Sequence, residues 1–388
     1  MLLPEAAGPH DPAPTTPVRR AGSIRRTSSI DSSRPDGLGG DVVVVARARD
    51  LWTDASGSGT VLATAELRLR LEAMTRAIVS IDATPEPAGL DGLMGLSVGP
   101  GFRGKLAAAL PDEQHSGSLL YLLLDDLPGA SLVSGYALQR TGMFDAPIVT
   151  AAPGPSEGPA PDPGADPSGG PGPRPTRVSL TAAQLPAVDL CAGWASDSAM
   201  MDAIRATGVI PTPMGPVAPR LERADDPDGW HAMDPLGPHA MRRRRRLDLS
   251  ADPVASDPGA SDPAPGATHR LDAHFRDSHM DADGEETVVH EYGLEGTVDA
   301  ARGQMMTLAA RAHVLPWMEC PGALASAGRL VGMPLEGLRS TVRRDFTGTS
   351  TCTHLNDMLR SLSDVGALVD ALGRAGRSRS GAWGPAGG

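Results

Sequence analysis

Residues Ile24–Asp31 read IRRTSSID, and residues Met241–Asp248 read MRRRRRLD, which matches them without a gap. Further anchors recur in the same order in the two parts of the chain, with a slip of a single residue. They are Arg49-Asp50 with Arg276-Asp277, Ala65-Glu66 with His290-Glu291, Leu93-Met94-Gly95 with Leu330-Val331-Gly332, and Gly101-Phe102-Arg103 with Gly337-Leu338-Arg339. We therefore predict that the chain contains one domain twice, because similarity at this spacing indicates an internal repeat.

Only the second copy carries cysteine and histidine side chains suited to chemistry. Gly117-Ser118-Leu119-Leu120 occupies the place of Cys352-Thr353-His354-Leu355, and Ala65 occupies the place of His290. The first copy is therefore expected to fold without these side chains. We predict that any functional site lies in the second copy.

The composition limits the classes of protein that need to be considered. A length of 388 residues is typical of two or three domains. Glycine and proline number 46 and 37 while aromatic residues make up only 3%, so part of the chain is expected outside any packed core. The net charge of -12 argues against general affinity for nucleic acid, which requires a basic face. We expect no nucleic-acid partner.

Membrane and export signals are not apparent in the sequence. No stretch reaches the roughly 18 apolar residues that a membrane span requires. The first residues lack the basic and then apolar layout of a signal peptide. Three cysteines, Cys191, Cys320 and Cys352, are too few for a disulfide framework and are typical of a reducing compartment. We expect a cytoplasmic protein with no membrane partner.

Shifts in composition divide the chain into segments. The proline-rich start and the Pro/Gly/Asp/Ser tracts cannot bury enough apolar surface to order themselves. The predicted organisation is a disordered N-terminus over 1–20, a first copy over 21–140, a linker with weak helical segments over 141–238, a second copy over 239–375 with a disordered insert over 252–267, and a disordered tail over 376–388.

Each copy is predicted to contain antiparallel strands followed by helices. Apolar and charged residues alternate over Glu66–Glu72, which predicts a half-buried strand, and Ala77–Ile81 predicts another. Their counterparts are Thr287–Val298 and Met305–Ala312. From about Thr353 onward, Leu355, Met358, Leu359 and Leu362 fall on one stripe of a helix. The fold class is therefore α+β, with two tandem related domains joined by the disordered linker.

Cys320, Cys352 and His354 indicate a metal site by their residue types and their places at two predicted helix starts, although their spacing is not that of a standard zinc finger. Cys352 and His354 stand at the predicted start of a helix, where the helix dipole is expected to lower the pKa of the thiol. Cys320 lies in a turn after a strand and opens another helix. With His290, Asp357 or Glu319 completing the set, these ligands suit zinc or iron.

Two other interpretations of the same residues stay open. Cys352 is a candidate nucleophile for an acyl-transfer or hydrolytic enzyme, with His290 or His354 as its base. Free cysteine is also among the most buried residue types, and a histidine near a helix start often only satisfies a carbonyl. In that case both copies would form a non-catalytic interaction module.

Other clusters are interpreted as structural. His269, His274 and His279 are expected at the surface. The run Arg242–Arg246 is expected to enter the first strand of the second copy. Gly99–Gly104 is rich in glycine but has no phosphate-loop lysine, so no nucleotide cofactor is indicated.

Several of these motifs resemble a bacterial family known as domain of unknown function 2889. They are Val289-His290-Glu291, the turn Pro316–Cys320, Leu330-Val331-Gly332 and Cys352-Thr353-His354-Leu355. The resemblance covers about Arg242–Leu372 well and the first copy only in outline. The family usually has glycine before the cysteine where this chain has Thr351, and the family name implies no biochemical function.

A fainter resemblance is to iron–sulfur scaffold proteins of the NifU N-terminal type. It rests on Glu319–Ala327 followed by a second cysteine at a helix start. It implies Cys320 and Cys352 as ligands, with His354 or an acidic neighbour as the third, although an early cysteine is missing from the second copy.

The two copies are expected to pair within one chain or in a homodimer.

Overall fold

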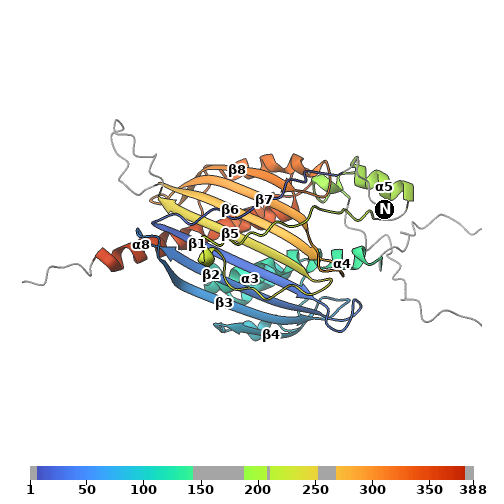
Figure 1. The fold of residues 1–388 in the computed structure, drawn as a ribbon, viewed down its shortest axis with the longest axis horizontal. Coiled ribbons are helices and arrows are strands. Elements are labelled where there is room, and N and C mark those ends of the chain that lie inside the picture. The colour runs from blue at the N-terminus through green and yellow to red at the C-terminus, as the bar shows by residue number, and fades with distance from the viewer. Residues whose placement is uncertain (1–6, 143–187, 208–209, 252–267, 381–388) are drawn as a thin grey trace, which may run out of the picture.

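The computed structural model describes residues 7–142, 188–207, 210–251 and 268–380, and these contain one eight-stranded antiparallel sheet (Figure 1). The strand order is β4-β3-β2-β1-β5-β6-β7-β8, so that the two halves of the chain meet where β1 pairs with β5. The strands are β1 (Ser23–Ser33), β2 (Val42–Thr53), β3 (Gly59–Leu71), β4 (Ile78–Thr84), β5 (Met241–Ala251), β6 (Thr268–Met280), β7 (Glu286–Asp299) and β8 (Gln304–Val314). The α+β class is confirmed, and the halves share one continuous sheet.

Helices cover one face of this sheet (Figure 1), with α3 against β1–β3 and α8 against β1 and β5. The α-helices are α1 (Phe102–Ala109), α2 (Pro111–His115), α3 (Leu119–Val133), α4 (Gly135–Arg140), α5 (Ala199–Thr207), α6 (Leu338–Asp345), α7 (Thr353–Ser361) and α8 (Val365–Ser380). Short 3₁₀ helices span Leu90–Leu93, Ala192–Trp194, Pro227–Gly229, Cys320–Leu330 and Leu362–Asp364. Among the described helices, none is long and apolar enough to cross a membrane.

The strands and the helix start predicted from periodicity are present. Glu66–Glu72 falls in β3, and Ala77–Ile81 overlaps β4. Thr287–Val298 and Met305–Ala312 fall in β7 and β8. The helix expected from about Thr353 begins at Thr353. The alternation in β3 and the apolar stripe of α7 both correspond to buried residues, which is why these elements could be predicted from the sequence.

The junction between the halves is held by crossed ion pairs. In the antiparallel register, Arg25 lies opposite Asp248 and Asp31 opposite Arg242. Arg25 donates to both oxygens of Asp248 at 2.6 and 2.8 Å, and Arg242 donates to both oxygens of Asp31 at 2.6 Å. The arginine run Arg242–Arg246 thus lies in β5 as expected, and its buried guanidinium groups are paired with acidic side chains inside the protein.

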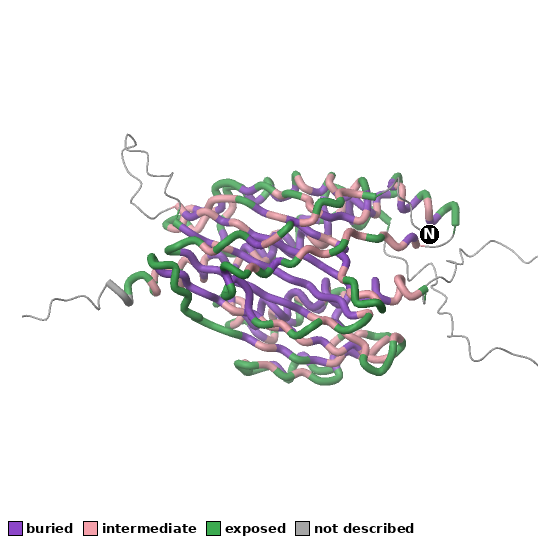
Figure 2. Tube along the Cα trace, viewed as in Figure 1, coloured by how far each residue is buried: buried purple, intermediate pink, exposed green. Residues whose placement is uncertain are grey.

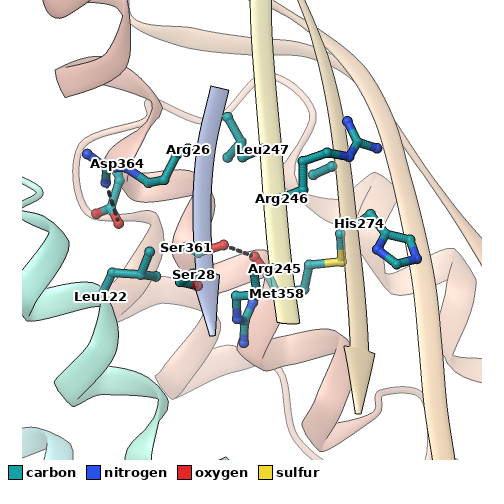
Figure 3. Close-up of a pocket in the computed structure, with 11 residues that line it drawn as sticks. Arg26, Ser28, Leu122, Arg245, Arg246, Leu247, His274, Met358, Ser361 and Asp364 are labelled. Atoms are coloured by element: carbon teal, nitrogen blue, oxygen red, sulfur yellow. Dashed lines mark hydrogen bonds and ion pairs between the residues drawn. The ribbon is translucent and has the colours of Figure 1, made fainter. Parts of the chain in front are cut away.

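A second set of charges lies between the sheet and its helices. Arg26 pairs with Asp50 at 2.8 Å and with Asp364 at 3.4 Å, and Arg245 pairs with Asp126 of α3. Figure 3 shows Arg26 facing Asp364 beside a small cavity of about 20 Å³. A space of this size holds about one water molecule, so we assign it a structural role.

Each half also has its own apolar core on the helix-covered face. One core joins β2 and β3 to α3, and the other joins β5–β8 to the 3₁₀ helix Cys320–Leu330 and to α6–α8. Figure 2 shows the buried residues concentrated along the middle strands, with exposed residues at the two edges of the sheet. On this face the ion pairs of Arg26 with Asp364 and of Arg245 with Asp126 join the two halves.

The opposite face of the sheet carries two extended segments, which we call the straps. They are residues 7–20 and 210–238, and Ala13, Thr16 and Trp230 within them are buried. The disorder predicted for 1–20 therefore differs from the structure over 7–20. Backbone carbonyls of this proline-rich strap accept hydrogen bonds from buried arginines, since Pro17 O accepts from Arg25 and Ala13 O from Arg276.

Only parts of the other segments that we predicted to be disordered lie among the described residues. The proposed tail over 376–388 begins inside α8, which continues to Ser380. The predicted helical segments of the linker correspond to Ala192–Trp194 and α5. The rest of the linker over 143–187, the insert over 252–267 and residues 381–388 lie outside the described residues.

Candidate metal site and adjoining cavity

His290, His354 and Asp277 form a compact group on the helix-covered face of the second half. One nitrogen or oxygen atom from each lies within 4.8 Å of the others. The two imidazole rings stack, with centroids 3.6 Å apart and planes inclined by 21°. His290 Nδ1 lies 3.8 Å from Asp277 Oδ2. The group is thus a set of two nitrogen ligands and one oxygen ligand.

The sheet and one helix start position these three side chains. Asp277 and His290 are direct cross-strand partners in β6 and β7, and the register shifts immediately after Asp277. His354 is in the first turn of α7, whose N-cap is Cys352. Asp277 is anchored by Arg243, which donates to both carboxylate oxygens at 2.8 and 3.0 Å.

Both histidines of the group are neutral at ordinary pH. Burial penalises the imidazolium and lowers the pKa of His354 to about 4, and Arg243 adds to the effect. Burial likewise holds the pKa of His290 well below its usual value, with His354 contributing. Neutral imidazole is the form that binds a metal. His290 Nδ1 and His354 Nε2 are buried and find no hydrogen-bond partner among the described residues.

Cys352 lies beside this group but does not have the acidic thiol that its place at a helix start predicts. Its Sγ accepts a hydrogen bond from the Tyr292 hydroxyl at 3.2 Å and lies 4.0 Å from His354 Nδ1. Burial raises the pKa of the thiol, although Tyr292 and the first N–H groups of α7 act in the opposite direction. The prediction of a lowered pKa was therefore wrong, because burial of the thiol outweighs the effect of the helix start.

Cys320 begins a 3₁₀ helix, as expected, and is buried near Cys191. The segment from Cys191 to Gly193 lies between Cys320 and Thr351. The Ala192 N–H donates to Thr351 O at 2.9 Å, and a Cβ added at Gly193 would lie 2.7 Å from Cys320 Sγ. Burial raises the pKa of Cys320 well above its usual value. Within the described residues, no group of three close ligand atoms includes Cys320 or Cys352.

The two acidic candidates from the sequence lie elsewhere. Asp357 accepts hydrogen bonds from Arg243, Arg360 and Arg103 and belongs to the charged layer between sheet and helices. Glu319 caps α5 by accepting a hydrogen bond from the Ala199 N–H at 2.7 Å. The carboxylate that meets the histidines is Asp277, which the sequence marked only as part of the repeated Arg-Asp pair.

The remaining histidines of β6 are buried, so their predicted surface location was wrong. His269, His274 and His279 are at most 8% exposed. His274 pairs with Glu291, and His279 packs edge-on against Tyr136. Tyr136 of α4 packs against His279, and the strap 7–20 contacts Glu291, the partner of His274; the polar neighbours in the sequence did not reveal these contacts.

A cavity of about 380 Å³ adjoins the stacked histidines. His290 and His354 lie in its wall, as do all three cysteines, Cys191, Cys320 and Cys352. The first half contributes Val133 and Tyr136 from α3 and α4. The cavity therefore lies where the two halves and the segment after residue 188 meet. Cys191 had not been assigned to the site, because its distance along the chain gave no signal.

Comparison with known families agrees with the resemblance noted from the motifs. Residues 255–367 match the model of the family described as "Protein of unknown function (DUF2889)". No curated protein and no solved structure matches the chain. The fainter similarity to NifU-type scaffold proteins is thus without support. The matched segment contains Asp277, His290, Cys320, Cys352 and His354.

Proposed function

We propose that the protein binds a divalent transition metal, zinc or ferrous iron, through His290, His354 and Asp277. The observation that carries the proposal is the pair of stacked histidines, each with a buried ring nitrogen that lacks a partner among the described residues. Buried polar atoms without partners are rare in folded proteins and call for an explanation. A bound cation supplies one once the stacked rings turn so that each directs its in-plane lone pair at the metal.

The first half of the chain supports a functional role for the histidines. Arg26 and Asp50 there make the same ion pair as Arg243 and Asp277, and a register shift follows the aspartate in both places. The cross-strand partner of Asp277 is His290, whereas the cross-strand partner of Asp50 is Ala63. Ala63 therefore occupies the place of His290, which corrects the match of Ala65 with His290 made from the sequence. We interpret the halves as diverged copies, of which only the second has added the histidines.

The helix start shows the same contrast. Ser118 is the N-cap of α3 as Cys352 is the N-cap of α7. The second residue after the cap is Leu120 in one half and His354 in the other, which shifts the match made from the sequence, Gly117 with Cys352, by one residue. Because Leu120 is buried and packs in the apolar core, the fold does not require an imidazole at this position.

The donor set favours particular metals. Two imidazoles and one carboxylate suit zinc and ferrous iron, and three protein ligands leave positions open for water or substrate. Asp277 keeps its bonds to Arg243, since each carboxylate oxygen has two lone pairs. The cysteines that we predicted as ligands then form the cavity wall beside the metal.

The test is the metal content of protein purified without a histidine tag. We expect about one zinc or iron per chain, and loss of about tenfold or more in metal affinity in His290→Ala and His354→Ala, since each removes one ligand. His115→Ala, at an exposed position of α2, is the matched control and should retain the metal. Equal metal content in all four proteins would exclude the site.

A second candidate function is that of a cysteine-dependent enzyme. The 4.0 Å contact between Cys352 Sγ and His354 Nδ1 in the cavity wall favours it. Burial of the thiol opposes it, because the thiolate is the nucleophile. Metal-free protein in which iodoacetamide alkylates Cys352 near neutral pH would support this candidate over the metal site.

A further inference from the structure

The cavity beside the stacked histidines has the size of a site for a small organic molecule. Its volume of about 380 Å³ is within the range of roughly 300–1,000 Å³ typical of ligand pockets. Its wall is formed by separate parts of the chain, including the end of α3, the segment around Trp194 and the turn that contains Trp317. A closed apolar core would leave no such space, because protein interiors pack densely.

The wall lacks charge. Among the described residues that line the cavity there is no arginine, lysine, aspartate or glutamate. Tyr136, Trp194 and Trp317 supply aromatic surface, and Leu132, Val133 and Val289 supply aliphatic surface. A phosphorylated or multiply charged ligand would lose its hydration without gaining a paired cation, which is costly. The cavity therefore favours an apolar ligand body.

One end of the cavity differs from the rest. His290 and His354 lie in the wall, whereas Asp277 does not line the cavity. A metal held by the three residues would therefore have its open positions on the cavity side. Zinc and ferrous iron accept an oxygen donor at an open position, and an anionic oxygen offsets the charge of the metal.

We propose that this cavity binds a small apolar monocarboxylate, whose carboxylate completes the coordination of the metal at His290 and His354 while its hydrocarbon part packs against the aromatic wall. The proposal rests on the metal site proposed above. It predicts that binding depends on the metal, because the described wall offers the carboxylate no cationic side chain.

The experiment is calorimetric titration of benzoate and hexanoate into the full-length protein, with the metal content measured first. Both carboxylates are expected to bind the metal-loaded protein, and at least about tenfold more weakly after the metal is removed with a chelator. Benzyl alcohol, which lacks the carboxylate, and phenyl phosphate, which carries a second charge, are expected to bind more weakly than benzoate. Val133→Phe, which fills part of the cavity, should weaken hexanoate binding while the metal content stays unchanged.

The outcomes separate the two proposals. If the protein contains the metal but binds neither carboxylate, the ligand proposal fails and the metal site stands. If the metal-free protein binds the carboxylates equally well, the coupling to the metal is wrong. If no metal is found, both proposals fail. Should Val133→Phe not fold, Leu132→Trp, at a more exposed position of the same wall, replaces it with the same expectation.

Discussion

His231 shows how single buried groups set the pH range in which this fold is stable. It belongs to the strap 210–238 and faces β1, where its ring nitrogens hydrogen-bond to Ser29 Oγ at 2.8 Å and Thr27 Oγ1 at 2.9 Å. Burial lowers its pKa to about 3, and the guanidinium groups of Arg49 and Arg47 add to this effect. The folded protein therefore keeps His231 neutral in mildly acidic solution.

We predict that this histidine destabilises the folded state as the pH falls below about 6.5, because the unfolded chain binds a proton that the folded chain does not. The loss continues down to the folded pKa of about 3. Between pH 7 and pH 5 it should amount to about 2 kcal/mol for this group. Urea unfolding at both pH values measures it.

His231→Asn provides the comparison, since asparagine can hydrogen-bond to the same hydroxyl groups without titrating. The variant should lose about 2 kcal/mol less than the wild type between the two pH values. His274 and His279, whose pKa values are also lowered by burial, titrate in both proteins and cancel in the difference. An equal loss in both proteins would show that His231 is not protected in the folded state.

At the site, the sequence identified the histidines but not their partner. The contrast between the copies pointed to His290 and His354, which the structure brings together. Asp277 did not stand out, because its pairing with Arg243 is repeated by Asp50 and Arg26 and so was interpreted as part of the fold. The cysteine prediction relied on helix starts alone, and spacing along a chain does not determine the distance between two helix starts.

At the scale of elements, the strap over residues 7–20 stabilises the sheet through its backbone. Ala13 O accepts from Arg276, and Pro17 O accepts from Arg25. Thr16 Oγ1 accepts from the Trp230 indole at 2.8 Å, which ties the two straps together. The donors are buried, so removal of the acceptors on the strap would leave charged or polar groups without partners.

We predict that deletion of residues 1–20 lowers the free energy of unfolding by about 3 kcal/mol or more, because two hydrogen bonds to buried charged groups contribute about 1.5–3 kcal/mol each. Chemical denaturation of the two proteins measures the difference. The control is Pro14→Ala, at an exposed strap position, where a change within about 0.5 kcal/mol is expected. If the deletion variant is as stable as the wild type, water must accept the hydrogen bonds that the strap accepts in the intact protein.

Regular elements were predictable from the sequence, and the straps were not. Alternation over Glu66–Glu72 and the stripe from Leu355 to Leu362 each reflect one buried side, so a local pattern carries the information. A strap has no periodic pattern, because its contacts come from backbone carbonyls that every residue possesses. Its order depends on arginines such as Arg25 and Arg276, which belong to other elements.

For the whole molecule, the decisive feature is that the halves share charges as well as a sheet. Asp125 and Asp126 of α3 belong to the first half, and their partners Arg339, Arg360 and Arg245 belong to the second. Burial acts to raise the pKa of Asp125, but Arg339, Arg360 and Arg103 outweigh it and lower the pKa to about 2. Neither the joined sheet nor these contacts could be predicted from the sequence similarity of the halves, because a predicted repeat does not specify how its copies pair.

We therefore predict that residues 188–388 alone do not form a stable monomer. Separation would expose the edge of β5 and leave Arg242, Arg245 and Arg339 without Asp31, Asp126 and Asp125. Breaking a buried ion pair by removing one partner costs about 3–5 kcal/mol. Even a part of this cost for each pair, together with the exposed edge of β5, is large beside the roughly 5–15 kcal/mol that stabilises a typical domain. Circular dichroism and denaturation of the isolated fragment test this expectation.

Co-expression with residues 1–142 should restore a one-to-one complex, and the same partner carrying Asp125→Asn and Asp126→Asn should restore it less well. A fragment that unfolds cooperatively as a monomer would instead show that the second half is an independent domain and that the shared charges are dispensable.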